Sequence, residues 1–136
     1  MGSFSNDLEK KILDHVFGGG NDNYTAASPL YVALSTASPL ENGSGMAEPS
    51  AGAYVRKASY SGDWESAATP GGTIQNTATI TFVTATGSWG IITSFALYDA
   101  VTSGNMLMYG DLSASKTVAN GDIARFGIGA FDVSLG

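Results

Sequence analysis

Residues 77–82 read Thr-Ala-Thr-Ile-Thr-Phe, in which threonines alternate strictly with apolar side chains. A period of two places the two kinds of side chain on opposite faces of an extended strand, so this stretch predicts a half-buried β-strand. The threonines and the β-branched or aromatic partners also favour extended backbone. The stretch therefore indicates a β-protein whose core lies on one side of this strand.

Similar short segments lie on both sides of it. Residues 30–35 and 54–60 are typical of strands, and residues 37–53 between them are rich in Gly, Ser, Pro and Glu, which indicates one long surface loop. From Trp89 onward, Trp89, Ile91, Phe95 and Leu97 share one parity and are expected to face the core. Ile92, Ala96 and Tyr98 have the other parity, which indicates that both faces are covered.

The C-terminal third continues the pattern. Residues 106–109 predict a further strand, and Asn120-Gly121 predicts a hairpin with a type I′ turn. The last strand is expected over 123–135, with a bulge or bend near Gly129, where the apolar parity changes. Seven or so short strands, spaced roughly 8–12 residues apart, predict a mainly β fold, a jelly-roll-like sandwich or barrel.

One short N-terminal α-helix is expected before these strands. Ser3 or Ser5 is a suitable N-cap, and the glycines at 18–20 end the helix. An apolar stripe recurs every four residues at Phe4, Leu8, Ile12 and Val16. We predict a single β-rich domain over 1–136, with the helix at 1–18, a polar turn at 21–23 and the β-body at 24–136.

Charge is the most unusual feature of the composition. Only 13% of the 136 residues are charged, about half of the roughly 25% that is common in globular domains. A β-protein with so little charge either tolerates weak colloidal repulsion or hides surface against other chains. We favour the second interpretation, which predicts an assembly component that forms a homo-oligomer, most simply a trimer.

Several classes of function are not supported by the residues. The net charge is −6 and the basic residues are scattered, which argues against binding to nucleic acid or to anionic membranes. No apolar run approaches the ~18 residues of a membrane-spanning helix. The chain has no Cys and a single His, so a zinc site is not expected. We expect no metal and no cofactor.

Catalytic candidates are weak. His15 lacks an identifiable nucleophile and orienting acid, and a packing or interface role suits it better. Asp63 and Glu65 flank Trp64, a pattern that loosely suggests a sugar-binding edge or an acid pair, although a solvated loop with one anchoring Trp explains it more simply. The sequence therefore predicts that the protein is not an enzyme.

Candidate interface residues are apolar or amphipathic side chains of the types that are enriched at protein interfaces. Trp64 and Tyr60 are balanced between core and interface roles, whereas Trp89 fits the core. The helix and the 37–53 loop are expected to supply the contacts to other chains. The candidates are Phe4, Leu8, Ile12, His15, Met46, Tyr60 and Trp64.

Several segments, in order along most of the chain, resemble small virion proteins of tailed phages that are labelled either as tail-fibre or as head decoration (cement) proteins. The resemblance lies in residues 4–6 and 12–19, Leu30 to Thr36, Glu48-Pro49 with residues 52–56, residues 85–90, residues 95–100 and residues 105–110. No catalytic motif comes with this family.

The resemblance implies a location in the virion after synthesis in the cytoplasm of the bacterial host. A cement protein sits on the outer capsid surface, as a trimer that contacts the major capsid protein, and stabilises the head. We expect this role first. A tail or tail-fibre component, structural or receptor-binding, is the alternative, and a phage-encoded glycan hydrolase is a third, weaker one.

Overall fold

The computed structural model describes residues 2–20, 24–67 and 72–134. It confirms a mainly β protein with one helix near the N-terminus. The elements, in chain order, are β1 (Gly2–Phe4), α1 (Asn6–Phe17), β2 (Leu30–Ser35), β3 (Lys57–Ser59), the 3-10 turn η1 (Ser61–Asp63), β4 (Thr73–Gln75), β5 (Ile80–Thr84), β6 (Gly90–Tyr98), β7 (Met106–Val118), β8 (Ile123–Phe126) and β9 (Asp132–Ser134).

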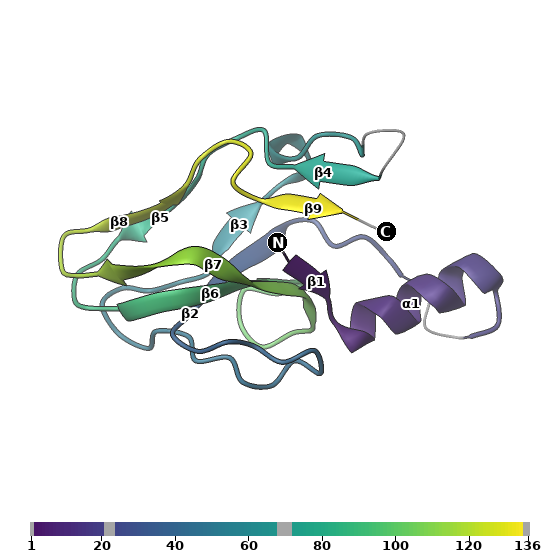
Figure 1. The fold of residues 1–136 in the computed structure, drawn as a ribbon, viewed down its shortest axis with the longest axis horizontal. Coiled ribbons are helices and arrows are strands. Elements are labelled where there is room, and N and C mark those ends of the chain that lie inside the picture. The colour runs from purple at the N-terminus through teal and green to yellow at the C-terminus, as the bar shows by residue number, and fades with distance from the viewer. Residues whose placement is uncertain (1, 21–23, 68–71, 135–136) are drawn as a thin grey trace.

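The strands form two layers of unequal width. One layer is a five-stranded sheet in the order β1-β7-β6-β2-β3, and the other consists of the two-stranded ribbons β4-β9 and β5-β8. All pairings are antiparallel. Figure 1 shows the two ribbons lying over the sheet, with α1 extending beyond it at one end. Over the described residues the strands do not close into a barrel, so the layers are those of an open sandwich.

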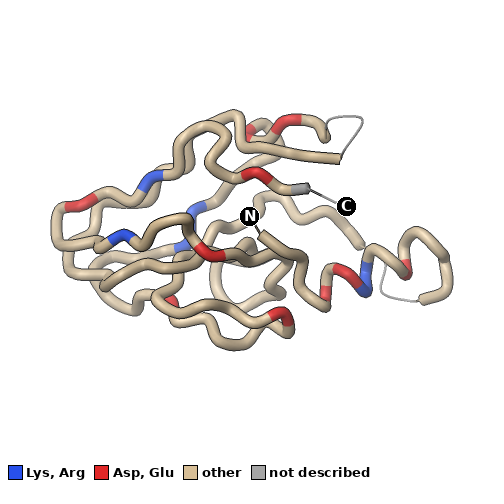
Figure 2. The backbone as a smooth tube through the Cα atoms, viewed as in Figure 1, with Lys and Arg blue, Asp and Glu red and all other residues tan. Residues whose placement is uncertain are grey.

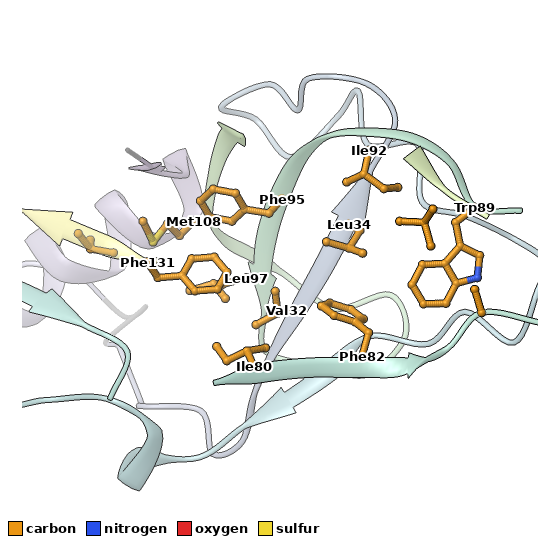
Figure 3. Close-up of a cluster of buried hydrophobic side chains, with 13 residues drawn as sticks. Val32, Leu34, Ile80, Phe82, Trp89, Ile92, Phe95, Leu97, Met108 and Phe131 are labelled. Carbon is orange, nitrogen blue, oxygen red and sulfur yellow. The ribbon is translucent and has the colours of Figure 1, made fainter. Parts of the chain in front are cut away.

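The main core fills the space between the layers. Val32 and Leu34 of β2 face this core, together with Phe82 of β5 from the opposite layer. Figure 3 shows these side chains converging. Trp89 is buried as predicted, and its indole N–H donates a 2.8 Å hydrogen bond to the carbonyl of Gly52. Further core residues are Ile80, Ala85, Ile92, Phe95, Leu97, Met108, Val118, Phe131 and Val133.

A second, smaller cluster covers the opposite face of the five-stranded sheet. Ala33, Ala96 and Tyr98 are buried there, with Met106 beside them. Ala33 alternates with the core residues Val32 and Leu34, as a strand with both faces covered requires. The prediction that both faces are covered is therefore confirmed.

The predicted parity of β6 is wrong in its first half. Ile91 is exposed and Ile92 is buried, the reverse of the expectation. The reason is a register shift between Ile92 and Ser94, where the single residue 93 lies opposite the four β7 residues 112–115. Such a bulge changes the face to which the following side chains point. Phe95 and Leu97, beyond it, face the core as predicted.

The N-terminus also differs from the prediction. Phe4 does not begin the helical stripe, because it lies in β1 and pairs with Met108 of β7. Ser5, one of the two expected caps, is the N-cap of α1. Gly18 ends α1 as predicted, with the positive φ of 65° that favours glycine at this position.

Two other predicted elements are shorter or differently used. Residues 54–60 form a strand only at Lys57–Ser59. The Asn120-Gly121 turn does not make a hairpin, since β7 belongs to the five-stranded sheet and β8 pairs with β5 in the other layer. Of these two turn residues, Gly121 has a positive φ and Asn120 does not, whereas a type I′ turn needs a positive φ at both. The turn instead carries the chain from one layer to the other.

The bend predicted near Gly129 is present, and Asn76 stabilises it. The buried Asn76 amide donates to the carbonyls of Ala78 and Gly127, both at 2.9 Å. Its carbonyl accepts from the Phe131 N–H at 2.9 Å. These bonds separate β8 from β9 and join the two ribbons. The predicted turn at 21–23, part of the loop before β4 (68–71), and residue 135 lie outside the described residues.

Candidate interaction surfaces

The first candidate surface is α1, which is anchored firmly at its N-terminal end. The Ser5 hydroxyl donates to the Met106 carbonyl and accepts from the Leu8 N–H. The Ser5 N–H donates to the Leu107 carbonyl at 2.9 Å. Leu8 is the buried residue of the helix. Because β7 holds the N-cap, the direction in which α1 leaves the sheet is fixed.

Two ion pairs stabilise the middle of the helix. Lys11 contacts Asp7 at 2.8 Å and Lys10 contacts Asp14 at 2.9 Å, both with a spacing of four residues. Such pairs add a few tenths of a kcal/mol each. The helix is therefore formed as far as its last turn, although few of its residues contact the body.

The last turns of α1 expose a group of large apolar side chains, here called the helix tip. Leu13 is 57% exposed, Val16 67% and Phe17 79%. Figure 1 shows this part of α1 extending away from both layers. Unlike single exposed apolar residues, neighbouring ones at spacings of three and four residues form a continuous apolar surface, and such surfaces mark contact sites. The helix tip is available to another chain.

The sequence prediction did not include any of these three side chains among the interface residues, although Val16 belongs to the predicted apolar stripe of the helix. Of the four helical candidates, Phe4 and Ile12 are half-buried and Leu8 is buried, so these three side chains hold α1 and β1 to the body. His15 is exposed in the last turn. Leu13 and Phe17 were missed, although their spacing of four residues was a usable signal.

The second candidate surface is the 37–53 loop, which is well ordered by internal bonds. The Thr36 N–H donates to the Ala47 carbonyl at 3.0 Å, and the Ala47 N–H donates to the Ser35 hydroxyl at 2.9 Å. The half-buried Met46 packs on the smaller cluster. The loop is thus a rigid cover for one face of the sheet rather than a free arm.

A polar cluster fixes this loop to the 99–105 loop. The Arg56 side chain is only 7% exposed and contacts Glu48 at 2.6 Å. It also donates to the carbonyls of Ala100 and Ser103 at 2.9 and 2.8 Å. The guanidinium carbon lies 3.7 Å from the centroid of the Tyr98 ring, a cation–π contact. We call this arrangement the Arg56 cluster; sequence patterns gave no signal for it.

The electrostatics of the cluster follow from these contacts. Burial would lower the pKa of the Arg56 guanidinium, but the hydrogen bonds and charge of Glu48 outweigh it and raise that pKa. For Tyr54 the effect of burial has the opposite sign, and it raises the pKa of the phenol. The Tyr54 hydroxyl donates to Glu48 at 2.9 Å and accepts from the Leu34 N–H at 2.9 Å. The cluster therefore holds a fixed charge pair and neutral phenols, which suits a structural role.

The remaining candidates, Tyr60 and Trp64, lie around η1. Tyr60 is exposed, whereas Trp64 is half-buried and packs on Phe131 with a ring-centroid distance of 5.9 Å. Trp64 belongs to the main core and Met46 to the cluster on the opposite face of the sheet. The seven candidates therefore do not form one continuous surface, and their contacts with other chains remain a prediction.

Two properties of the described residues bear on other functions. They contain no group of three or more His, Cys, Asp or Glu side chains arranged to hold a metal ion. Across the same residues, no helix combines the length and the apolar character that crossing a membrane would need.

Comparison with known families gives the identity. Residues 3–134 match the family model described as "Podophage GP4 fiber I protein gp80". The chain is a structural protein of the tailed-phage virion. More specifically, it belongs to the gp80 family of podophage fibre proteins. No curated protein matches the chain.

Proposed function

We propose that this protein is a fibre component at the virion surface, attached through the helix tip, with the β-body projecting as a rigid unit. The match of residues 3–134 to a fibre-protein family is the observation that supports this proposal most strongly. It reverses the order of the two roles expected from the sequence, in which capsid decoration came first.

The attachment role of α1 rests on its geometry. β7 holds the N-cap rigidly, while Val16 and Phe17 are exposed at the far end. A preformed helix loses little conformational freedom on binding, so its apolar contacts contribute more fully to affinity. Burying a Val or Phe side chain contributes about 1.5–3 kcal/mol. Burial of these side chains would therefore supply a substantial part of the affinity of a docking contact.

Capsid decoration is the second candidate. The low proportion of charged residues, 13%, favours extensive burial against other chains, as in a trimer seated on the major capsid protein. Self-association would serve either role. Light scattering of the free protein at micromolar concentration tests self-association. A mass of about three times 13.9 kDa supports a trimer, and a mass of 13.9 kDa contradicts self-association before assembly.

The number of copies per virion distinguishes the two roles. Quantitative mass spectrometry of purified virions, normalised to the major capsid protein, provides that number. A fibre component is expected at tens of copies or fewer, because tails have a small number of attachment positions. Hundreds of copies would support decoration of the capsid and overturn the fibre proposal.

A further inference from the structure

The chain contains two Asn-Gly pairs, Asn42-Gly43 in the 37–53 loop and Asn120-Gly121 between β7 and β8. Such a pair can modify itself, because glycine has no side chain to hinder the attack of its backbone nitrogen on the Asn side-chain amide. The fold places the two pairs in different surroundings. Their reactivity should therefore differ although the dipeptide is the same.

The side-chain carbonyl of Asn42 accepts two hydrogen bonds from Ser44, from the backbone N–H at 3.0 Å and from the hydroxyl at 2.7 Å. When a nucleophile attacks the carbon of this carbonyl, negative charge develops on the same oxygen. Donors that already point at the oxygen stabilise that charge, as in an oxyanion hole. Ser44 therefore activates the Asn42 amide and fixes its orientation.

The attacking nitrogen, that of Gly43, is only locally restrained. Its N–H donates to the Leu40 carbonyl at 2.9 Å, and residues 40–44 of this turn are all exposed or half-buried. Opening a single bond in an exposed turn buries and uncovers little apolar surface, so such openings are frequent in a folded protein. The Gly43 nitrogen is thus accessible for reaction.

The Asn120-Gly121 pair has neither property. The Gly121 N–H donates at 2.7 Å to the carbonyl of the buried Ala85, which joins the turn to the end of β5. The Asp122 carboxylate accepts from the Ala119 N–H at 2.9 Å and holds the same turn. No residue that the structure describes donates a hydrogen bond to the Asn120 side chain. This nitrogen is therefore held, and its target carbonyl is not activated.

We propose that Asn42 is a site of spontaneous self-modification in the folded protein. The Gly43 nitrogen bonds to the Asn42 side-chain carbonyl carbon and gives its proton to solvent. The carbon–nitrogen bond of the side-chain amide breaks, and ammonia leaves with a proton from solvent. Water then opens the resulting cyclic imide at either carbonyl, which gives aspartate or isoaspartate without oxidation or reduction.

The product changes the charge of one candidate interaction surface. Asn42 lines a polar cleft of about 450 Å³ together with the acidic residues Asp7 and Glu41. Figure 2 shows acidic positions along α1, and the loop contacts the start of this helix, where the Asn6 N–H donates to the Glu41 carbonyl at 3.0 Å. Modification adds one negative charge there, on a chain whose net charge is −6. This proposal does not depend on whether the protein belongs to the tail or to the capsid.

Peptide mapping by mass spectrometry tests the proposal on the folded protein in mildly alkaline buffer, because the change from amide to carboxyl adds about one dalton. We expect the Asn42 peptide to convert at least roughly threefold faster than the Asn120 peptide. In concentrated urea the two rates should become similar. Equal rates in the folded protein, faster conversion at Asn120 or no conversion would overturn the proposal. A difference that persists in urea would also contradict it, since the fold would not be the cause.

A substitution of Ser44 tests the activation directly. Ser44→Ala removes the hydroxyl donor and keeps the N–H donor, and it is expected to slow conversion of Asn42 roughly twofold to tenfold. The Asn120 rate in the same sample should not change, which shows that the variant stays folded. Ser50→Ala, at an exposed residue of the same loop, is the matched control and should keep the wild-type rate. Unchanged or faster conversion of Asn42 in the Ser44→Ala protein would contradict the role of Ser44.

Discussion

Arg56 donates hydrogen bonds to both carboxylate oxygens of Glu48, from Nε at 3.2 and 3.0 Å and from Nη2 at 2.6 Å. The pair is eight residues apart and lies at the end of the long loop. Because Arg56 also contacts Tyr98 and two carbonyls of the 99–105 loop, one side chain joins three separate segments. The loop face of the sheet is rigid for this reason.

Removing the guanidinium should therefore cost considerable stability. Arg56→Met leaves Glu48 partly buried without its partner, and we expect the free energy of unfolding to fall by about 2–4 kcal/mol, since breaking one side of a buried ion pair is expensive. Urea denaturation measures this loss. Lys57→Met, at the exposed neighbouring position, is the control and should change stability by no more than about 0.5 kcal/mol. Equal effects of the two substitutions would contradict the structural role of the cluster.

Replacing Asn76 should lower the free energy of unfolding by a similar amount, for a different reason. Asn76→Ala leaves the Phe131 N–H and the Gly127 carbonyl without their side-chain partner at the bend between β8 and β9. Each unsatisfied buried group costs about 1–3 kcal/mol, so a total loss of roughly 2–4 kcal/mol is expected in the same urea assay. Thr77→Ala, at the adjacent exposed residue, should have little effect. If the Asn76→Ala protein were as stable as wild type, other groups would have to hold the bend.

The pH dependence of stability should reveal the contribution of the Asp111 carboxylate. Hydrogen bonds from the Ser94 and Ser38 hydroxyls hold the pKa of its carboxyl below the ordinary value. A depressed folded-state pKa stabilises the fold above the unfolded value of about 3.9 and loses this contribution as the pH falls through the folded pKa. Wild type should thus exceed Asp111→Asn in stability at pH 6, and the difference should shrink toward pH 3. A constant difference would exclude this linkage.

The helix tip should matter for assembly and not for folding. Val16→Ser combined with Phe17→Ser changes two exposed side chains, so urea stability should stay within about 1 kcal/mol of wild type. Lost burial of both side chains should weaken attachment at least roughly tenfold. The measurement is the number of variant copies incorporated when the protein is supplied to phage that lack it.

Glu9→Ser, also exposed on α1, is the control and should be incorporated normally. Normal incorporation of the Val16→Ser, Phe17→Ser protein would exclude the helix tip as the attachment surface. Deleting residues 1–17 would be a less specific test than this pair of substitutions. Such a deletion also removes β1 and the buried Ser5 and Leu8, so loss of assembly would not separate folding from attachment.

Local patterns in the sequence predicted much of the fold. The alternation around Ile80 and Phe82, the buried Trp89, the helix ending at Gly18 and the bend near Gly129 all follow from nearest-neighbour spacing and turn chemistry. The exposure of Ile91 could not be predicted in this way, because the face on which it lies depends on extra residues in β7, a strand that is distant in sequence. The three residues of β1 were missed because so short a strand has no period of its own and forms by pairing with β7.

The interaction surfaces were less predictable than the fold. Apolar spacing identified the helix, but which of its sides packs inward depends on where Ser5 attaches to β7. The Arg56 cluster joins residues from 48 to 103, and no local pattern encodes such a contact.

The location of the protein in the virion tests the central claim most directly. Gold-labelled antibodies against the purified protein, applied to intact virions and viewed by electron microscopy, show that location. If the protein is a fibre component, the label concentrates at the tail, and the capsid surface stays unlabelled. Label distributed over the capsid surface would contradict the fibre role and would favour decoration of the head.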